Sequence, residues 1–341
     1  MVYKFPLWLY KYIMTDAKLG NIIRPGTKGD VVLLGFPHDE GVAVNGGRSG
    51  ARHGPERFRF WISQYGTVEN PCAEVDLTNL SVADAGDVSA DLSLEKAHAE
   101  LTARTGEILQ SGSIPFVIGG GNDQSYPNAS ALLTAAGRRG NKLPTAASRR
   151  GNKLPTPKPE QPIGVINIDA HLDVRPLKDG RAHSGSSFRQ LLEDSRFSGN
   201  HFIEFAAQGS QCSREHAQYI LDRNGRILWL DEVQGKNPVS ESFITALGNL
   251  AWECPSIFVS FDLDSVAGRD APGVSCPGIM GLNTEEATAI AYQAGLHPAV
   301  ALFDLSEYNP DIEEERTGRL AAAIFYFFCM GTAKRLSGSP S

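Results

Sequence analysis

The stretch IGVINIDAHLD (Ile163–Asp173) decides the fold that this chain is expected to adopt. Its first half is almost continuously apolar and rich in β-branched side chains, which is typical of a strand covered on both faces of a sheet. Its second half carries Asp169, His171 and Asp173 at alternate positions, so an extended chain would present all three on one side. A buried strand that ends in potential metal ligands predicts an open parallel sheet with a site beyond the carboxyl ends of its strands.

Six further runs share the length and the apolar, β-branched composition of this strand. They are Val31–Pro37, Ile114–Gly121, His201–Ala207, Ile227–Leu230, Ile257–Asp264 and Val300–Glu307. The segments between them, such as Ser93–Leu109 and Thr284–Ala294, have helical spacing and open with Ser or Thr near acidic residues. Because alternating strands and helices imply βαβ crossovers, we predict an α/β fold with a mostly parallel sheet between two helical layers.

The chain shows no linker-like change of composition, and one large α/β sheet can absorb all 341 residues. We therefore predict a single domain, residues 1–341. One segment stands apart, because TAAGRRGNKLP (Thr134–Pro144) is followed directly by TAASRRGNKLP (Thr145–Pro155) as an 11-residue tandem duplication. Its small, polar and basic residues can bury little apolar surface, so we expect an exposed loop at about 137–162.

The composition excludes several classes of protein. The 32 Lys and Arg against 39 Asp and Glu leave a net charge of −7, which argues against a nucleic-acid partner. No apolar run approaches the roughly 18 residues of a membrane-spanning helix, and the apolar stretch Phe5–Met14 is expected to be a surface helix rather than a signal peptide. The five cysteines are scattered and form no CxxC pair, which is typical of a reducing compartment. We therefore expect a cytoplasmic protein without a membrane partner.

Four of the predicted strands end in residues that bind metals or cationic groups. Because the carboxyl ends of parallel strands meet at one edge of a sheet, we expect these side chains to lie together. A single Asp-x-Asp after a strand is usually a turn or a helix cap, so the argument depends on the agreement of four strand ends. The candidate residues are Asn122, Asp169, His171, Asp173, Asp262, Asp264 and Glu307.

The charge of this set predicts a pair of metal ions. Four aspartates at one buried edge would repel one another strongly unless cations neutralise them. A single divalent ion would leave the cluster anionic, whereas two ions that share bridging carboxylates would not. Oxygen ligands with one imidazole favour Mn²⁺ or a similar octahedral ion over tetrahedral zinc.

These motifs resemble those of the ureohydrolase superfamily, which includes arginases, agmatinases and formiminoglutamases. The blocks GGGxD, DAHxD, SFDxD and ExNP occur in the order of that family, from about Val31 to Phe328. The formiminoglutamase branch is the most similar. That similarity is carried by GVAVNGGRSGARHGPERFR (Gly41–Arg59), DVRP (Asp173–Pro176), SGSSFRQ (Ser184–Gln190), APGVSCPG (Ala271–Gly278) and RTGRLAAA (Arg316–Ala323).

The resemblance implies a three-layer α/β/α sandwich with an eight-stranded sheet, and two Mn²⁺ ions per subunit. It implies that Asp169 and Asp262 bridge the ions, that Asp173 completes one ligand shell, and that His171 and Asp264 complete the other. Asn122 stands where the family usually has His, and a carboxamide oxygen ligates a transition ion less strongly than an imidazole. Family members are commonly trimers or hexamers, so a homo-oligomer is expected.

The resemblance also implies an activity, the hydrolysis of N-formimino-L-glutamate to L-glutamate and formamide by a hydroxide that bridges the two ions. Asp173 would pass the proton to the departing amine, and Glu307 would hold the formimino group. Arg175 is expected on the same side as Asp173, where a guanidinium would bind a substrate carboxylate. The further candidates for substrate binding are Ser184, which aligns with the proton-relay His of arginases, His183 beside it, and then Arg48.

Two alternatives remain open. One is another ureohydrolase activity, on arginine, agmatine or a guanidino acid, against which Arg175 argues mildly. The other is a metal-poor, arginase-like pseudoenzyme retained for binding or assembly, which the replacement at Asn122 suggests. Separately, Cys276 could be redox-sensitive if it is exposed, although a free cysteine more often packs as a small hydrophobe.

Overall fold

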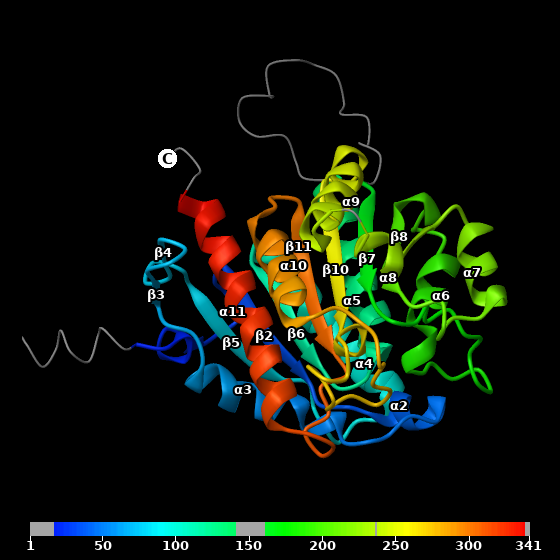
Figure 1. Ribbon diagram of the computed structural model, residues 1–341, viewed down its shortest axis with the longest axis horizontal. Helices are drawn as coiled ribbons and strands as arrows, with labels where there is room; N and C mark the ends of the chain where they lie inside the picture. The colour runs from blue at the N-terminus through cyan, green and yellow to red at the C-terminus, as the bar shows by residue number, and fades with distance from the viewer. Residues whose placement is uncertain (1–16, 141–160, 236, 338–341) are drawn as a thin grey trace, which may run out of the picture.

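The structure is a computed structural model that describes residues 17–140, 161–235 and 237–337. Its centre is a nine-stranded sheet in which all neighbouring strands are parallel (Figure 1). In sheet order the strands are β1 (Arg24–Pro25), β5 (Val82–Asp87), β2 (Val31–Phe36), β6 (Ile114–Gly119), β11 (Val300–Ser306), β10 (Ser256–Asp262), β7 (Ile163–Ile168), β8 (Phe202–Ala207) and β9 (Arg226–Trp229). A short antiparallel pair, β3 (Glu69–Asn70) and β4 (Val75–Asp76), lies outside this sheet.

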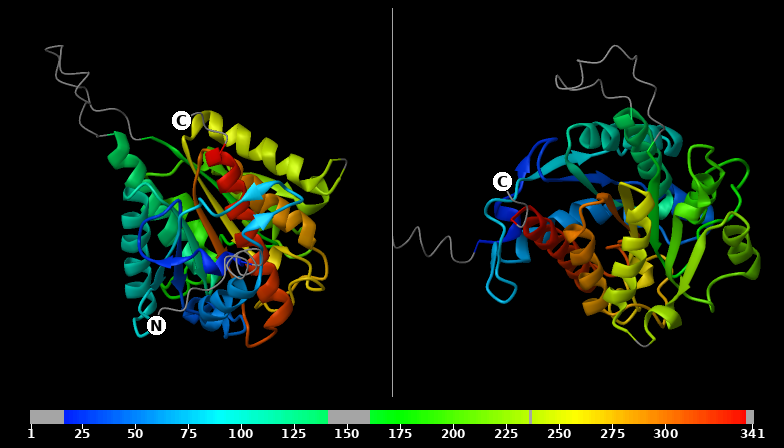
Figure 2. Two further views of the ribbon diagram at one scale, coloured as in Figure 1. Left: turned by 90° about the vertical axis from the view of Figure 1, so that its left-hand side faces the viewer. Right: turned by 90° about the horizontal axis from the view of Figure 1, so that it is seen from above.

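Successive residues of a strand face opposite helical layers, and this alternation divides the interior into two cores. In β2, for example, Val31 and Leu33 belong to one core, whereas Val32 and Leu34 belong to the other. The first core is covered by α3 (Gly54–Gln64), α9 (Val239–Glu253), α10 (Thr284–Leu296) and α11 (Glu315–Ser337). The second is covered by α4 (Leu94–Gln110), α5 (Ser125–Gly140), α6 (Ser187–Glu193) and α7 (Arg214–Leu221), on the opposite face of the sheet (Figure 2). The short α2 (Glu40–Asn45) and α8 (Leu230–Val233) complete the helices numbered α2 to α11.

The predicted α/β fold is confirmed, and each predicted apolar run forms a strand of the sheet. The sheet has nine strands rather than eight, because the two-residue β1 pairs with the outer side of β5. The sequence analysis did not identify β5, since VADAGD lacks a continuous apolar run. Its carboxylates are paired instead: Arg59 of α3 donates two hydrogen bonds to Asp84, at 2.8 and 2.9 Å.

The helical predictions are confirmed where the structure describes them. Ser93–Leu109 corresponds to α4, and Thr284–Ala294 corresponds to α10. The first copy of the duplication begins inside α5, which continues to Gly140, and residues 141–160 lie outside the described part of the chain. Residues 137–140 of the predicted loop therefore belong to α5 instead, and the loop stays a prediction over residues 141–160. The predicted helix at Phe5–Met14 also lies outside the described residues. Among the described helices, none is long and apolar enough to cross a membrane.

Candidate active site

The candidate ligands lie together because their strands are neighbours. β6, β11, β10 and β7 are adjacent in the sheet, although they are far apart along the chain. Asn122 follows β6, Asp169 follows β7, Asp262 ends β10 and Glu307 follows β11. The four carboxyl ends thus deliver their side chains to one place, as the sequence analysis expected.

These side chains line a cavity of about 240 Å³. Eight of the predicted site residues face it: Asn122, His171, Asp173, Arg175, Ser184, Asp262, Asp264 and Glu307. Asp169 is fully buried beneath them, and His183 is not among the lining residues. Asn45, Gly46, Gly47, Arg48, Ser275 and Cys276 complete the wall.

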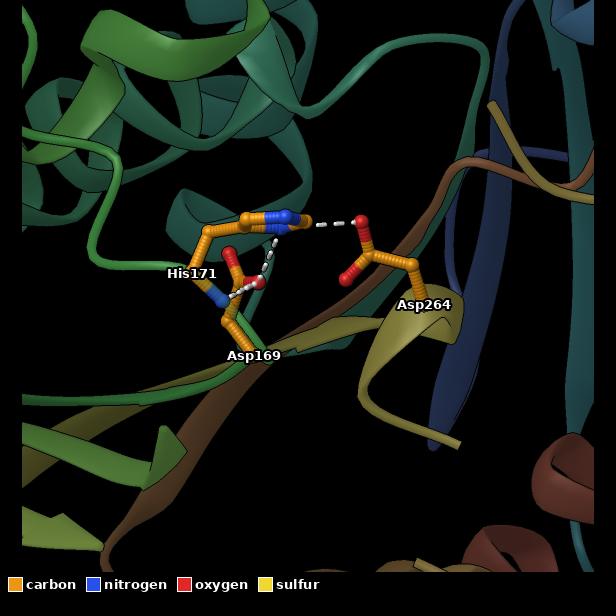
Figure 3. Close-up of side chains that lie close together, drawn as sticks. All are labelled: Asp169, His171 and Asp264. Atoms are coloured by element: carbon orange, nitrogen blue, oxygen red, sulfur yellow. Dashed lines mark hydrogen bonds and ion pairs between the residues drawn. The ribbon is translucent and has the colours of Figure 1, made fainter. Parts of the chain in front are cut away.

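Two sets of ligand atoms in this cavity could each hold a cation. Asp169, His171 and Asp264 form one set, and Asp169, Asp173 and Asp262 form the other, with the ligand atoms of each set within 4.8 Å of one another. Figure 3 shows the ring of His171 joined to both carboxylates of its set, with Nδ1 3.1 Å from Asp264 Oδ2 and 3.4 Å from Asp169 Oδ1. Asp169 belongs to both sets, which is the geometry that a bridging carboxylate requires.

The electrostatics of the cluster agree with a cation site. Burial and the neighbouring carboxylates raise the pKa of Asp173 and of Asp262 well above the ordinary value, and they raise that of Asp264 to about 6. The charge of Asp264 raises the pKa of His171. Burial opposes ionisation of Asp169, but hydrogen bonds and the charge of His171 hold its pKa below the ordinary value. Clustered carboxylates with one imidazole are a donor set that fits Mn²⁺.

Unpartnered oxygens also point to a cationic ligand. Asp264 Oδ1 and Glu307 Oε2 are buried without a hydrogen-bond partner among the described residues. The other oxygen of Glu307 accepts a bond from the Asn122 backbone N–H at 3.3 Å. Burial and the charge of Asp264 raise the pKa of Glu307 to about 8, so this carboxyl is ready to ionise when a cation approaches.

The carboxamide of Asn122 contacts two of the three carboxylates of the second set. Its Nδ2 donates to Asp173 Oδ2 at 2.7 Å and to Asp169 Oδ2 at 3.3 Å. Its Oδ1 accepts from Ser125 Oγ at 2.8 Å and from Ser306 Oγ at 3.1 Å. A half-turn of the amide exchanges its oxygen and nitrogen at almost no change in shape, and it would direct the oxygen toward the carboxylate set.

Asp173 and Glu307, the predicted catalytic residues, hold backbone conformations that L-residues rarely adopt. Their φ angles are 44° and 68°, in the left-handed region. Such conformations cost about 1–3 kcal/mol each and are found preferentially at functional sites. The Glu307 conformation is supported by a bond from its own N–H to the Gly120 carbonyl at 2.8 Å.

Two exposed arginines, Arg175 and Arg48, line the same cavity as the buried carboxylates and form its basic rim. Arg175 Nη1 donates to Asn45 Oδ1 at 3.0 Å, and Asn45 Nδ2 donates to Ser184 Oγ at 3.0 Å. Arg48 donates to the carbonyls of Ser275 and Val274, at 3.0 and 2.7 Å. Asn45 was not among the predicted site residues. The signal for it in the sequence was the segment NGGR, in which Asn45 ends α2 and Gly46 follows in the left-handed conformation.

His183 and Cys276 have different surroundings. His183 is buried outside the cavity lining, and its Nε2 lies 2.9 Å from the Pro176 carbonyl oxygen. Its contacts therefore brace the loop after Arg175, and its part in substrate binding stays a prediction. Cys276 is exposed and lines the cavity, and all five cysteines of the chain are free thiols.

Comparison with known proteins identifies the family. The sequence model of the Arginase family matches residues 29–331. The formimidoylglutamase of Geobacillus thermodenitrificans is 32% identical over 306 residues, which cover 87% of this chain and 82% of that protein. The crystal structure of Trypanosoma cruzi formiminoglutamase with Mn²⁺ is 45% identical, with a TM-score of 0.78, and the match covers 90% of this chain and 94% of that one.

A more distant structure extends the likeness of the fold. The formimidoylglutamase of Bacillus subtilis is 21% identical and has a TM-score of 0.79, over 98% of this chain and 94% of that one. The predicted resemblance to ureohydrolases, with formiminoglutamases the most similar branch, is thereby confirmed. This chain belongs to the arginase family.

Proposed function

We propose that this chain is a Mn²⁺-dependent formiminoglutamase, which hydrolyses N-formimino-L-glutamate to L-glutamate and formamide. The observation that carries the proposal is the division of one cavity into an acidic floor and a basic rim. Buried carboxylates form the floor, and Arg175 and Arg48 line the same cavity. A substrate that carries a cationic formimino group and two carboxylates matches both parts. The formimidoylglutamases among the relatives of this chain support the same substrate.

The ligand sets support two ions per subunit. We propose that Asp169, Asp173, Asp262 and the Asn122 oxygen would hold one ion, and that Asp169, His171 and Asp264 would hold the other. Asp262 belongs to one set only, so its expected role as a second shared ligand stays a prediction. When bound, Mn²⁺ supplies Lewis acidity and lowers the pKa of water to near neutrality. The role of the protein is to hold the carboxylates close together, and bound cations would favour their ionised form.

Two carboxylates of the floor would act directly on the substrate. Glu307 would bind the formimino group through Oε2, which has no hydrogen-bond partner among the described residues. Asp173 faces the cavity on a backbone held in the left-handed region, and it would carry a proton to the departing amine. Both roles require a carboxylate fixed at the cavity wall, which the strained backbone supports.

The rim would bind the glutamate portion. Asn45 links the Arg175 guanidinium to Ser184, which would hold that cation at the edge of the cavity for a bidentate contact with a carboxylate. Arg48 offers a second cation, held by two backbone carbonyls. Two fixed cations suit a substrate with two carboxylates better than agmatine or arginine, which carry a net positive charge.

A panel of substrates assayed with and without added Mn²⁺ tests the proposal. The expected result is Mn²⁺-dependent release of formamide from N-formimino-L-glutamate. Release of urea from arginine, agmatine or a guanidino acid as the main reaction would favour another ureohydrolase activity. No turnover of any substrate by the Mn²⁺-loaded protein would favour the pseudoenzyme that Asn122 suggested.

We also propose a cytoplasmic homo-oligomer, a trimer or hexamer as is common in this family. The free state of all five cysteines supports a reducing compartment. Exposed apolar side chains at Trp252 and Ile279, 91% and 93% accessible, support the burial of further surface between subunits. Light scattering coupled to size-exclusion chromatography measures the number of subunits directly.

A further inference from the structure

We propose that Ser125 and Asp304 are positioning residues, which form a buried hydrogen-bond chain that orients the carboxamide of Asn122 toward the metal centre. Neither residue lines the cavity, and neither belongs to the two ligand sets. Ser125 begins α5, and Asp304 lies on β11. The inference rests on the proposed role of Asn122 as a ligand, and it concerns how a carboxamide can serve where the family usually has an imidazole.

The chain is a continuous set of short contacts below the cavity. Ser125 Oγ lies 2.8 Å from Asn122 Oδ1, 3.1 Å from Ser260 Oγ and 3.1 Å from Asp304 Oδ2. Asp304 Oδ2 also accepts a bond from Asn128 Nδ2 at 2.9 Å. All five residues are buried. A serine hydroxyl has a single proton, so Ser125 can donate to only one of these oxygens at a time.

That single proton couples Ser125 to the orientation of Asn122. When Ser125 donates to Asn122 Oδ1, the amide oxygen faces away from the carboxylates, and Nδ2 faces Asp173 and Asp169. In this orientation the amide stabilises the carboxylates but offers no oxygen to a cation. A half-turn of the amide is required before Asn122 can act as a ligand.

After the half-turn, the two neighbouring hydroxyls can reverse their direction. The amide N–H groups would then donate to Ser125 Oγ and Ser306 Oγ, which lie 2.8 and 3.1 Å from the present amide oxygen. The Ser125 hydroxyl would then donate its hydrogen bond to Asp304 Oδ2 at 3.1 Å. The Ser306 hydroxyl would donate to Asp262 Oδ2 at 3.3 Å. Every buried donor keeps an acceptor. The turned amide oxygen and the carboxylates of Asp169 and Asp173, which lose the Nδ2 donor, then face one another, and a bound cation would satisfy all three.

Asp304 is needed in this arrangement as the final acceptor. It is fully buried and forms no ion pair with any residue that the structure describes, and its Oδ1 has no hydrogen-bond partner there. Burial raises its pKa to about 7. A carboxyl in such a place is costly. Its use as an acceptor for Ser125 gives a physical reason for its presence next to the metal centre.

Mn²⁺ titration of the full-length, metal-depleted protein, by calorimetry at pH 8 without substrate, tests the chain. Ser125→Ala removes only the linking oxygen, and it should weaken one of the two Mn²⁺ sites about 10- to 100-fold, the usual effect of removing an outer hydrogen-bond partner. Asp304→Ala should weaken the same site. Ser125→Thr keeps the hydroxyl and should restore the affinity. The matched control is Thr332→Val, which deletes a buried hydroxyl bonded to the Phe328 carbonyl at 3.0 Å in α11 and should leave both sites unchanged.

The same variants in an Asn122→Ala background separate positioning from a general structural effect. With the carboxamide gone, Ser125→Ala should cause no further loss of Mn²⁺ affinity. Wild-type affinity in Ser125→Ala, or an equal loss in both backgrounds, would overturn the proposal, as would two tight sites in Asn122→Ala alone. Because these readouts need no substrate, an absence of formamide release with the expected binding pattern would contradict the proposed function and not this inference.

Discussion

At the scale of single residues, the charges in the cavity are unevenly placed, and we expect them to favour one orientation of a bound substrate. The carboxylates of Asp262, Asp264 and Glu307 are buried at the floor, whereas Arg175 is exposed at the rim of the same cavity. Opposite charges at the two ends favour one orientation of a substrate that is itself cationic at one end and anionic at the other. We therefore expect the choice of substrate to depend on a few charged side chains rather than on the shape of the cavity alone.

Replacement of Arg175 tests the basic rim. A charged hydrogen bond left unmade costs about 1.5–3 kcal/mol, so Arg175→Ala should lower kcat/KM for N-formimino-L-glutamate about 10- to 100-fold, mainly through KM. Arg175→Lys should recover only part of this, because an ammonium lacks the planar fork of a guanidinium. Steady-state kinetics measure the effect.

The control for this variant is Arg181→Ala, which removes an arginine of the same loop that pairs with Glu40 outside the cavity lining. It should leave kcat/KM unchanged, and Mn²⁺ content should be unchanged in both proteins. Normal kinetics in Arg175→Ala would remove Arg175 from the substrate site and make Arg48 the next candidate.

Asn122→His should keep or tighten Mn²⁺ binding at the site that Asn122 completes. An imidazole nitrogen is a stronger ligand for a transition ion than a carboxamide oxygen, and it requires no half-turn of an amide. Metal content after dialysis against dilute chelator measures the difference from the wild-type protein. Loss of one ion from the His variant would contradict the assignment of Asn122 to a ligand shell.

At the scale of elements, the packing of α10 on α11 depends on glycines that bring two backbones together. A Cβ added at Gly295 would lie 2.1 Å from the Phe328 carbonyl oxygen, and one added at Gly331 would lie 2.1 Å from that of Tyr292. These neighbours are backbone atoms, so they could not move aside for a new Cβ as the end of a flexible side chain could. Residues of α10 and α11 pack in the first core together with residues of β10 and β11, two of the strands that carry the site.

Gly331→Ala should therefore destabilise the protein, by about 1–3 kcal/mol or more, as overpacking usually does. Gly248→Ala is the matched control, because it makes the same change in helix α9 at a position with no neighbouring atom within 4 Å. It should be neutral or stabilising by up to about 1 kcal/mol, through helix propensity. Denaturant unfolding compares the two. Equal stabilities would mean that α10 and α11 can separate at little cost.

At the scale of the whole molecule, the strand order creates the site. β6 and β7 are consecutive strands along the chain, but β11 and β10 lie between them in the sheet, which gives the order β6-β11-β10-β7. Ligands in open α/β sheets bind where strand order changes in this way. The metal centre is thus a property of the completed sheet and links segments separated by up to 185 residues, as in the contact between Asn122 and Glu307.

Metal binding should couple to the stability of the whole fold in a pH-dependent manner. The ligand carboxylates must be ionised and His171 neutral for Mn²⁺ to bind. The pKa values of Asp264, Asp173, Asp262 and His171 are all raised, that of Asp264 to about 6, so protons compete with the metal more strongly as the pH falls. Added Mn²⁺ should therefore raise Tm much more at pH 8 than at pH 5, as measured by calorimetry. Equal stabilisation at both values would contradict a site built from these carboxylates.

The local pattern of the sequence was enough to predict the strands and the candidate ligands that the structure brings together. Apolar runs such as Ile163–Ala170 predicted strands, because burial on both faces requires an uninterrupted apolar sequence. The spacing of Asp169, His171 and Asp173 predicted ligands, because alternation along an extended chain is itself local. β5 was missed, since it carries two aspartates that are paired by Arg59, which lies 25 residues away from Asp84.

The orientation of side chains within the site was decided only by tertiary structure. The contact between Arg175 and Asn45 joins residues 130 positions apart, and the contact between Ser125 and Asp304 joins residues 179 positions apart. Neither pair has a signature in its own stretch of sequence. Hydrogen-bond direction depends on which groups the folded backbone brings within about 3 Å. The sequence therefore indicated the candidate ligands of this site, and the fold determined the orientation of each side chain.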